Sequence, residues 1–162
     1  MNFRPSCLAM SIAMALPGLA MARPVTITTT LKNHGGDGAY LALYLTDPSG
    51  APVRTLWVAG RKSKYHKHLS DWYRATGGAA AQINGITGAS VGAGRALKVS
   101  VELADALFDA GYSLQVDAAV EDMRDSPNEI ELPLTSSGAT ANGRASYSCG
   151  NVNSRLLQVI NE

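Results

Sequence analysis

Cysteine, net charge and long apolar runs are all scarce in this chain of 162 residues. It has two cysteines, and its 14 Lys and Arg nearly balance its 13 Asp and Glu. A nucleic-acid binder needs a basic excess to displace counterions from phosphates, so that class is excluded. The apolar stretch Cys7–Leu19 is shorter than the about 20 residues that a permanent membrane-spanning helix needs, and no later stretch is long enough.

Aromatic residues are also few, at 6% of the chain, whereas there are 16 glycines and seven prolines. This composition favours strands and turns over a helical bundle. The hydrophobic content of 46% excludes a disordered tail. The length allows one ordinary domain.

The first 22 residues are typical of a secretory signal peptide. Arg4 supplies the positive charge, Cys7–Leu19 the apolar region, and Ala20-Met21-Ala22 the small residues at a cleavage site. A buried N-terminal helix is the alternative, but the segment has no polar face. Cleavage after Ala22 leaves residues 23–162 as a single domain of net charge zero, with Cys149 as its one cysteine. We expect a soluble periplasmic protein without an internal disulfide.

Alternating apolar residues predict about seven short strands in the rest of the chain. A turn at Asp47-Pro48-Ser49-Gly50 predicts a β-hairpin over residues 39–59, whose first strand is apolar on both faces. Residues 97–103 and 112–120 are predicted to pair around a turn at 109–111. The remaining strands are expected at 25–31, 130–134, around Tyr147 and at 156–160. The predicted fold is all-β with one inserted helix, an immunoglobulin-like antiparallel β-sandwich.

The inserted helix is predicted from apolar residues at helical spacing, namely Tyr65, Leu69, Trp72 and Tyr73, with Gly77-Gly78 as its end. Residues 54–74 are basic, with one acid, Asp71, against six Lys and Arg; residues 102–131 hold nine acids against Arg124. Two solvated faces would explain this charge pattern. The alternative is a basic face that binds an anionic ligand or partner.

The small-residue segment 79–95 contains Asn84-Gly85-Ile86-Thr87-Gly88-Ala89-Ser90. Glycines let the backbone bend, and the neighbours of the Ser90 hydroxyl have almost no side chain to shield it. Another protein's active site could therefore approach this hydroxyl closely. No strand leads from it into a helix, so it is not a dinucleotide-binding loop. Composition alone also allows a plain flexible loop.

This loop is similar to the acceptor motif of periplasmic flavin transferases, Asp-x-x-[Ser/Thr]-Gly-Ala-[Thr/Ser]. The surrounding chain resembles the exported "domain of unknown function 2271" proteins. The resemblance covers about residues 25–121 and rests on AYLALYLT at 39–46, DPSGAPVRTL at 47–56, Lys64-Tyr65, Leu69 with Trp72, and the TGAS loop. It implies that a flavin transferase attaches FMN through a phosphoester at Ser90, with Thr87, Gly88, Ala89 and Asn84 as recognition residues.

Two features depart from that family pattern. Asn84 stands where the motif has an acid, and an amide brings no charge for a metal or a basic partner. The chain also has Leu103-Ala104-Asp105-Ala106 where the family tends to have Trp-Asp-Gly. A second partial match, Ser137-Gly138-Ala139-Thr140, has Leu134 at the acidic position and makes Thr140 the competing acceptor.

The resemblance implies an FMN-carrying electron-transfer protein with a membrane redox partner, rather than an enzyme with its own small substrate. Trp57, Tyr65, Trp72 and Tyr73 are candidate neighbours of the flavin ring, although such residues are more often plain core residues. The alternative function is a non-redox binding or interaction module whose loop stays unmodified.

Other constellations predict no further chemistry. His66 and His68, two residues apart, would point about 200° apart on a helix and could not share a metal ion. Cys149 without a nearby base is typical of a small core residue. No Ser/His/Asp arrangement indicates hydrolysis, so we expect no metal site and no catalytic residues.

Overall fold

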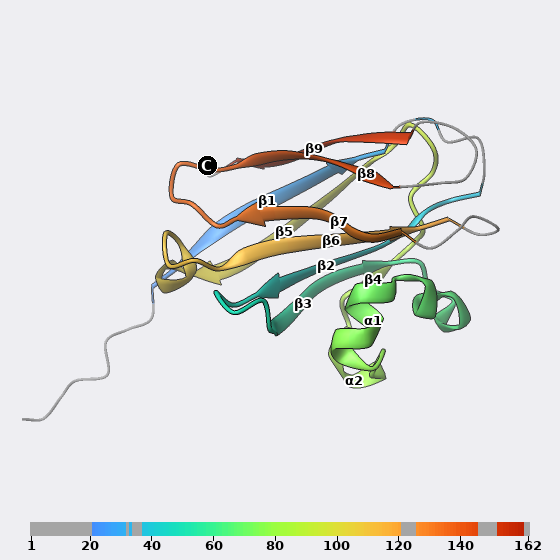
Figure 1. Ribbon diagram of the computed structural model, residues 1–162, viewed down its shortest axis with the longest axis horizontal. Helices are drawn as coiled ribbons and strands as arrows, with labels where there is room; N and C mark the ends of the chain where they lie inside the picture. The colour runs from blue at the N-terminus through green and yellow to red at the C-terminus, as the bar shows by residue number, and fades with distance from the viewer. Residues whose placement is uncertain (1–20, 32, 34–36, 121–125, 146–151, 161–162) are drawn as a thin grey trace, which may run out of the picture.

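Two stacked β-sheets form the body of the protein in the computed structural model (Figure 1), which describes residues 21–31, 33, 37–120, 126–145 and 152–160. One sheet has the strand order β5 (Ala96–Ala104), β1 (Ala22–Thr30), β9 (Val152–Ile160) and β8 (Thr140–Ala145). The other has the order β4 (Thr87–Gly88), β3 (Pro52–Ala59), β2 (Tyr40–Thr46), β6 (Ser113–Ala119) and β7 (Ser126–Pro133). The predicted all-β sandwich with an inserted helical segment is confirmed.

Strand β2 lies at the centre of the five-stranded sheet, and all seven of its residues are buried. Its leucines at positions 41, 43 and 45 join the core between the two sheets. On the other face, Tyr40, Ala42 and Tyr44 join a second cluster under the helical segment. The sheet is therefore covered on both faces, which explains why this strand is apolar throughout.

The β2–β3 hairpin turns at Asp47, as the sequence predicts. The Gly50 N–H donates to the Asp47 carbonyl at 2.9 Å. The Asp47 carboxylate accepts hydrogen bonds from the Ser49 N–H at 2.8 Å and the Ala51 N–H at 3.0 Å. A carboxylate that binds the backbone two residues ahead is a common way to close such a turn.

The inserted segment differs from the prediction of one continuous helix over Tyr65–Tyr73. A 3-10 helix, η1 (Ser63–His68), is followed by α1 (Ser70–Thr76), and Leu69 between them has φ −78° and ψ 73°, outside the helical region. Leu69 is fully buried under α1. The end of α1 at Gly77 is confirmed, since Gly77 adopts φ 65° and its N–H donates to the Tyr73 carbonyl. These helices lie on the side of the five-stranded sheet away from β1, β8 and β9 (Figure 1).

The predicted pairing of residues 97–103 with 112–120 is wrong. Strand β5 pairs with β1, whereas β6 pairs with β2 and β7 in the other sheet. Alternation predicts that both segments are strands, but a turn between them allows either a hairpin or a crossing to the second sheet. Here the chain crosses through the short 3-10 helix η2 (Asp105–Leu107).

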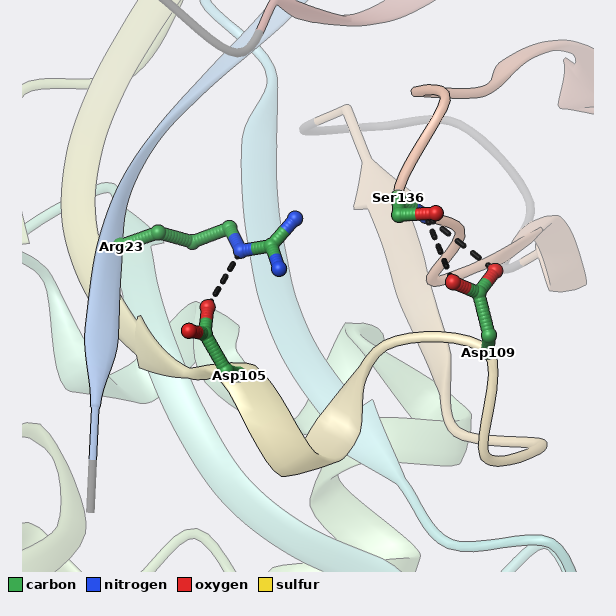
Figure 2. Close-up of polar contacts among 4 residues, drawn as sticks. All are labelled: Arg23, Asp105, Asp109 and Ser136. Atoms are coloured by element: carbon green, nitrogen blue, oxygen red, sulfur yellow. Dashed lines mark hydrogen bonds and ion pairs between the residues drawn. The ribbon is translucent and has the colours of Figure 1, made fainter. Parts of the chain in front are cut away.

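Polar contacts hold this crossing in place (Figure 2). Arg23 on β1 donates from Nε to Asp105 at 2.5 Å, and its guanidinium lies 4.3 Å from the centre of the Phe108 ring. Asp109, at φ 55°, accepts the Ser136 N–H at 3.2 and 3.3 Å. The start of β1 and the β7–β8 connection are thereby fixed to the crossing.

Parts of both chain ends lie outside the described residues. The residues left out include 1–20 of the predicted signal peptide, as well as Tyr147 and Cys149. Ala22 already belongs to β1, opposite Ala104. Among the described residues, no helix has the length and hydropathy to cross a membrane.

Candidate functional site

The predicted acceptor loop runs along the outer edge of β3. The Val58 N–H donates to the Ile86 carbonyl and the Gly60 N–H to the Gly88 carbonyl, both at 2.9 Å, so β4 pairs with β3 in parallel. Beyond β4, Val91 and Ala39 exchange two hydrogen bonds of 2.7 and 2.8 Å. The segment 79–95 also contains the short helix α2 (Ala80–Ile83). It is therefore hydrogen-bonded to the sheet rather than a loop without regular structure.

Ser90 is exposed and lies against a residue without a side chain. A Cβ atom placed on Gly38 would come within 2.6 Å of Ser90 Oγ. Gly88 is similarly close to Trp57, because a Cβ there would lie 2.7 Å from Cζ2 of the indole. The small residues thus bring backbone close to both side chains, while Ser90 as a whole residue remains exposed.

The five predicted site residues lie along this one segment but do not meet in one cavity. Asn84 follows α2 and is exposed, and Thr87 is half-buried in β4; both line one pocket. Ala89 and Ser90 are exposed beyond β4, past Gly88. The competing acceptor Thr140 is the first residue of β8, after a turn in which the Thr135 hydroxyl donates to the Gly138 carbonyl at 2.8 Å.

We call the pocket beside Asn84 and Thr87 the Arg61 pocket. It is open to solvent and has a volume of about 440 Å³. Its lining comes from the start of η1, from α2 and from β4: Arg61, Ser63, His66, Ala80, Ala81, Ile83, Asn84, Gly85 and Thr87. The lining includes no Asp or Glu, so its charge is positive. Arg61 and Ser63 line the pocket but were not predicted as site residues from the sequence. The one signal for them was that a basic segment directly follows the predicted hairpin 39–59.

Gly60 joins the acceptor segment to the basic segment. Its N–H donates to the Gly88 carbonyl, and its carbonyl lies 2.8 Å from His66 Nε2. It has φ +107°, and a Cβ atom there would fall 2.0 Å from the Tyr40 ring. Only glycine fits this conformation and this space. His66 is buried and serves this contact, and the described residues contain no group of three His, Cys, Asp or Glu that could hold a metal ion.

The four aromatic residues considered as ring neighbours occupy different environments. Trp72 has no exposed surface, and its Nε1–H donates to Thr55 Oγ1 at 3.0 Å, so it is a core residue. Trp57 and Tyr65 are half-buried, and Tyr73 is 39% exposed. The amino groups of Lys62 and Lys64 lie 5.8 and 4.4 Å from the Tyr65 ring centre. Trp57, Tyr65 and Tyr73 therefore remain open to contact with a ligand.

A second polar cluster lies under α1 and contains the buried Asp117. One carboxylate oxygen accepts the Trp72 N–H at 2.6 Å, and the other accepts the Tyr44 hydroxyl at 3.5 Å. Burial raises the pKa of Asp117 to about 6, because it penalises the charged form. Burial, followed by the nearby Asp117 charge, also raises the pKa of Tyr44.

This raised pKa of Asp117 gives stability a defined pH dependence. The folded state binds the proton more tightly than the unfolded state, so this contribution is complete below about pH 4 and is lost as the pH rises through about 6. We expect the free energy of unfolding to fall by about 3 kcal/mol across this window from Asp117 alone. Urea denaturation at several pH values would measure it.

Asp117→Asn is the matched variant, since it keeps an oxygen for the Trp72 N–H. We expect its free energy of unfolding to lack this component of the fall between pH 4 and 7. Equal pH profiles for the wild type and Asp117→Asn would contradict the assignment.

The comparisons with known proteins identify a family but no relative. The family model described as "Predicted periplasmic protein (DUF2271)" matches residues 22–149, so the chain belongs to this family. No curated protein and no solved structure matches significantly.

Proposed function

We propose that this member of a family of predicted periplasmic proteins is an exported electron carrier with FMN attached covalently to Ser90. The observation that supports the proposal most directly is the exposed Ser90 hydroxyl at the end of a Thr-Gly-Ala-Ser segment, beside Gly38 and Ala89. Such a hydroxyl is accessible to the active site of a second protein, because no large side chain of its own segment covers it.

Attachment would be a transfer from FAD catalysed by a periplasmic flavin transferase. A bond forms between Ser90 Oγ and the phosphorus of the FMN half, the phosphoanhydride bond to the AMP half breaks, and AMP leaves. The serine proton passes to a base of the transferase or to water. This chain supplies the nucleophilic hydroxyl and the backbone that presents it.

The residues around the loop suit a flavin phosphate. Ser90 is an exposed residue, the missing side chain of Gly38 makes room for its hydroxyl, and the neighbouring Arg61 pocket is lined by a cation without any carboxylate. The flavin would supply reversible redox chemistry, while the protein tunes it by charge, hydrogen bonding and exclusion of water. The proposed electron donor or acceptor is a membrane redox partner.

A binding or interaction module with an unmodified loop is the second candidate function. Asn84 favours it, because this residue replaces the acid of the acceptor motif and is exposed beside the Arg61 pocket without a charge.

Intact mass spectrometry distinguishes the two functions. The chain would be exported together with its own transferase, whose activity is verified on a control substrate. We expect a mass increase of one FMN in the wild type and in Thr140→Ala, and none in Ser90→Ala, which lacks the nucleophile. An unmodified wild type beside an active transferase would support the binding module instead.

Asn84→Asp tests the departure from the motif. If an acid at this position assists the transferase, the modified fraction at an early time point should rise severalfold over the wild type. Asn84→Ala is the control, since it removes the amide without adding charge. An unchanged modified fraction in Asn84→Asp would show that position 84 does not limit the transfer.

A further inference from the structure

We infer that the Arg61 pocket seats the isoalloxazine ring of the flavin held at Ser90, and that Arg61 raises the reduction potential of that ring. This inference rests on the proposed function and adds to it the place of the ring and the residue that tunes it. The argument depends on position, lining and charge.

The pocket and the acceptor hydroxyl lie at the same end of β3. The hydrogen bond from Gly60 to Gly88 aligns the two segments, and Arg61 is the next residue after Gly60, whereas Ser90 is two residues after Gly88. Thr87 lines the pocket, and the three Cα–Cα steps from Thr87 to Ser90 span at most about 11 Å. Because the phosphate and the five-carbon ribityl chain lie between Ser90 and the ring, the ring need not sit at Ser90 itself.

The lining suits a planar group with an apolar face and polar edge. Ala80, Ala81 and Ile83 offer an apolar wall, and Arg61 and Ser63 offer hydrogen-bond donors. The volume of about 440 Å³ lies within the range of small-molecule sites. Arg61 itself is exposed and has no ion-pair partner among the described residues, so its charge is available to a ligand.

Two other pockets suit the ring less well. Both adjoin Tyr44, Ala75 and Pro52 toward the N-terminal end of β3, and one of them also reaches Gln82 and Ile86 of the acceptor segment. The other includes the carboxylates of Asp71 and Glu131. Ser90 follows Thr87 of the Arg61 pocket by three positions and Ile86 of the first of these pockets by four, so the Arg61 pocket is the nearer one along the chain.

Arg61 would act through charge. Reduction of a flavin by two electrons with uptake of one proton leaves one negative charge on the ring system. A guanidinium beside the ring stabilises this charge and therefore raises the potential. Removing Arg61 should lower the reduction potential of the attached flavin, and intact mass measures separately how much flavin is attached.

The first test compares Arg61→Gln with Arg54→Gln in flavinylated protein, using a titration with dithionite followed by absorbance. Both arginines are exposed near β3, but Arg54 lines a pocket at its other end. For Arg61→Gln we expect the equilibrium constant for two-electron reduction to fall about tenfold, a shift of ~30 mV. Arg54→Gln should match the wild type. Equal potentials in both variants would overturn the role of Arg61.

The second test fills the pocket. Ala81→Trp should displace the ring, so that iodide quenches the flavin fluorescence severalfold faster than in the wild type. Ala75→Trp is the control, since Ala75 is also exposed and lines the other pockets. If FMN is attached and its quenching is unchanged in Ala81→Trp, the placement of the ring in the Arg61 pocket is overturned, but the proposed function is not. If the wild type lacks the mass of FMN, the proposed function is overturned, and the placement of the ring with it.

Discussion

Replacing Gly60 by alanine is expected to lower the free energy of unfolding by roughly 3 to 5 kcal/mol. Two costs combine at this residue. Its φ of +107° is unfavourable for any residue with a Cβ, and that atom would overlap the Tyr40 ring, 2.0 Å away. Tyr40 cannot move easily, because it is buried against Tyr65 and His66. Urea denaturation would measure the loss.

Gly50→Ala is the matched control for Gly60→Ala. Gly50 also has a positive φ, of +83°, but a Cβ there would meet nothing within 4 Å. It should therefore show the backbone cost alone, of about 1 kcal/mol. If the two variants lose the same stability, the packing of Tyr40 on Gly60 contributes nothing. Hydrogen exchange of the amide of residue 60 should also rise in Gly60→Ala, because the hydrogen bond that this N–H donates to the Gly88 carbonyl would be strained.

Replacing Trp72 by alanine is expected to cost about 3 to 5 kcal/mol. The indole is fully buried between α1 and the five-stranded sheet, where it packs against His66 with ring centres 5.9 Å apart. Truncation leaves a cavity and deprives Thr55 of the hydrogen bond from the indole N–H. A domain of this size has only about 5 to 15 kcal/mol of total stability, so this variant should be close to unfolding.

Two further variants keep this prediction testable if Trp72→Ala does not fold. Trp72→Phe retains most of the volume and loses the hydrogen bond, so we expect about 1 to 2 kcal/mol. Tyr73→Ala removes the neighbouring aromatic residue, which is 39% exposed, and should cost less than about 1 kcal/mol. A greater loss in Tyr73→Ala than in Trp72→Phe would contradict the assignment of Trp72 to the core.

The strands could be predicted from the sequence because a half-buried strand imposes a period of two. Strand β5 shows this directly: Val99 and Leu103 are buried, and Lys98 and Ser100 are exposed. Which strands pair was harder, since periodicity does not distinguish a hairpin from a crossing. The division of the helical segment at Leu69 was also unpredictable, because its apolar residues fit one continuous helix; in the structure Leu69 is buried between the two helices with non-helical dihedrals.

The candidate site was predictable only as a segment. Small residues and a hydroxyl mark Thr87–Ser90 in the sequence, but the edge pairing with β3 depends on a hydrogen bond to Gly60, 28 residues earlier. Arg61 is one of several basic residues in the segment 54–74, and nothing in its sequence context distinguishes it from Lys62 or Lys64. Its place beside Asn84 follows from tertiary contacts.

Because the acceptor segment covers part of the edge of β3, it also affects self-association of the protein. On this side of β3, the described strand partners are Thr87 and Gly88, opposite Val58 and Ala59. An uncovered strand edge can pair with the same edge of another molecule and start aggregation. At the far end of the edge, Pro52 lacks an N–H and Arg54 adds an exposed charge, and both features discourage such pairing. Changes that detach β4 should therefore appear as loss of monomeric protein, so solubility must be checked before reduced modification is attributed to chemistry at Ser90.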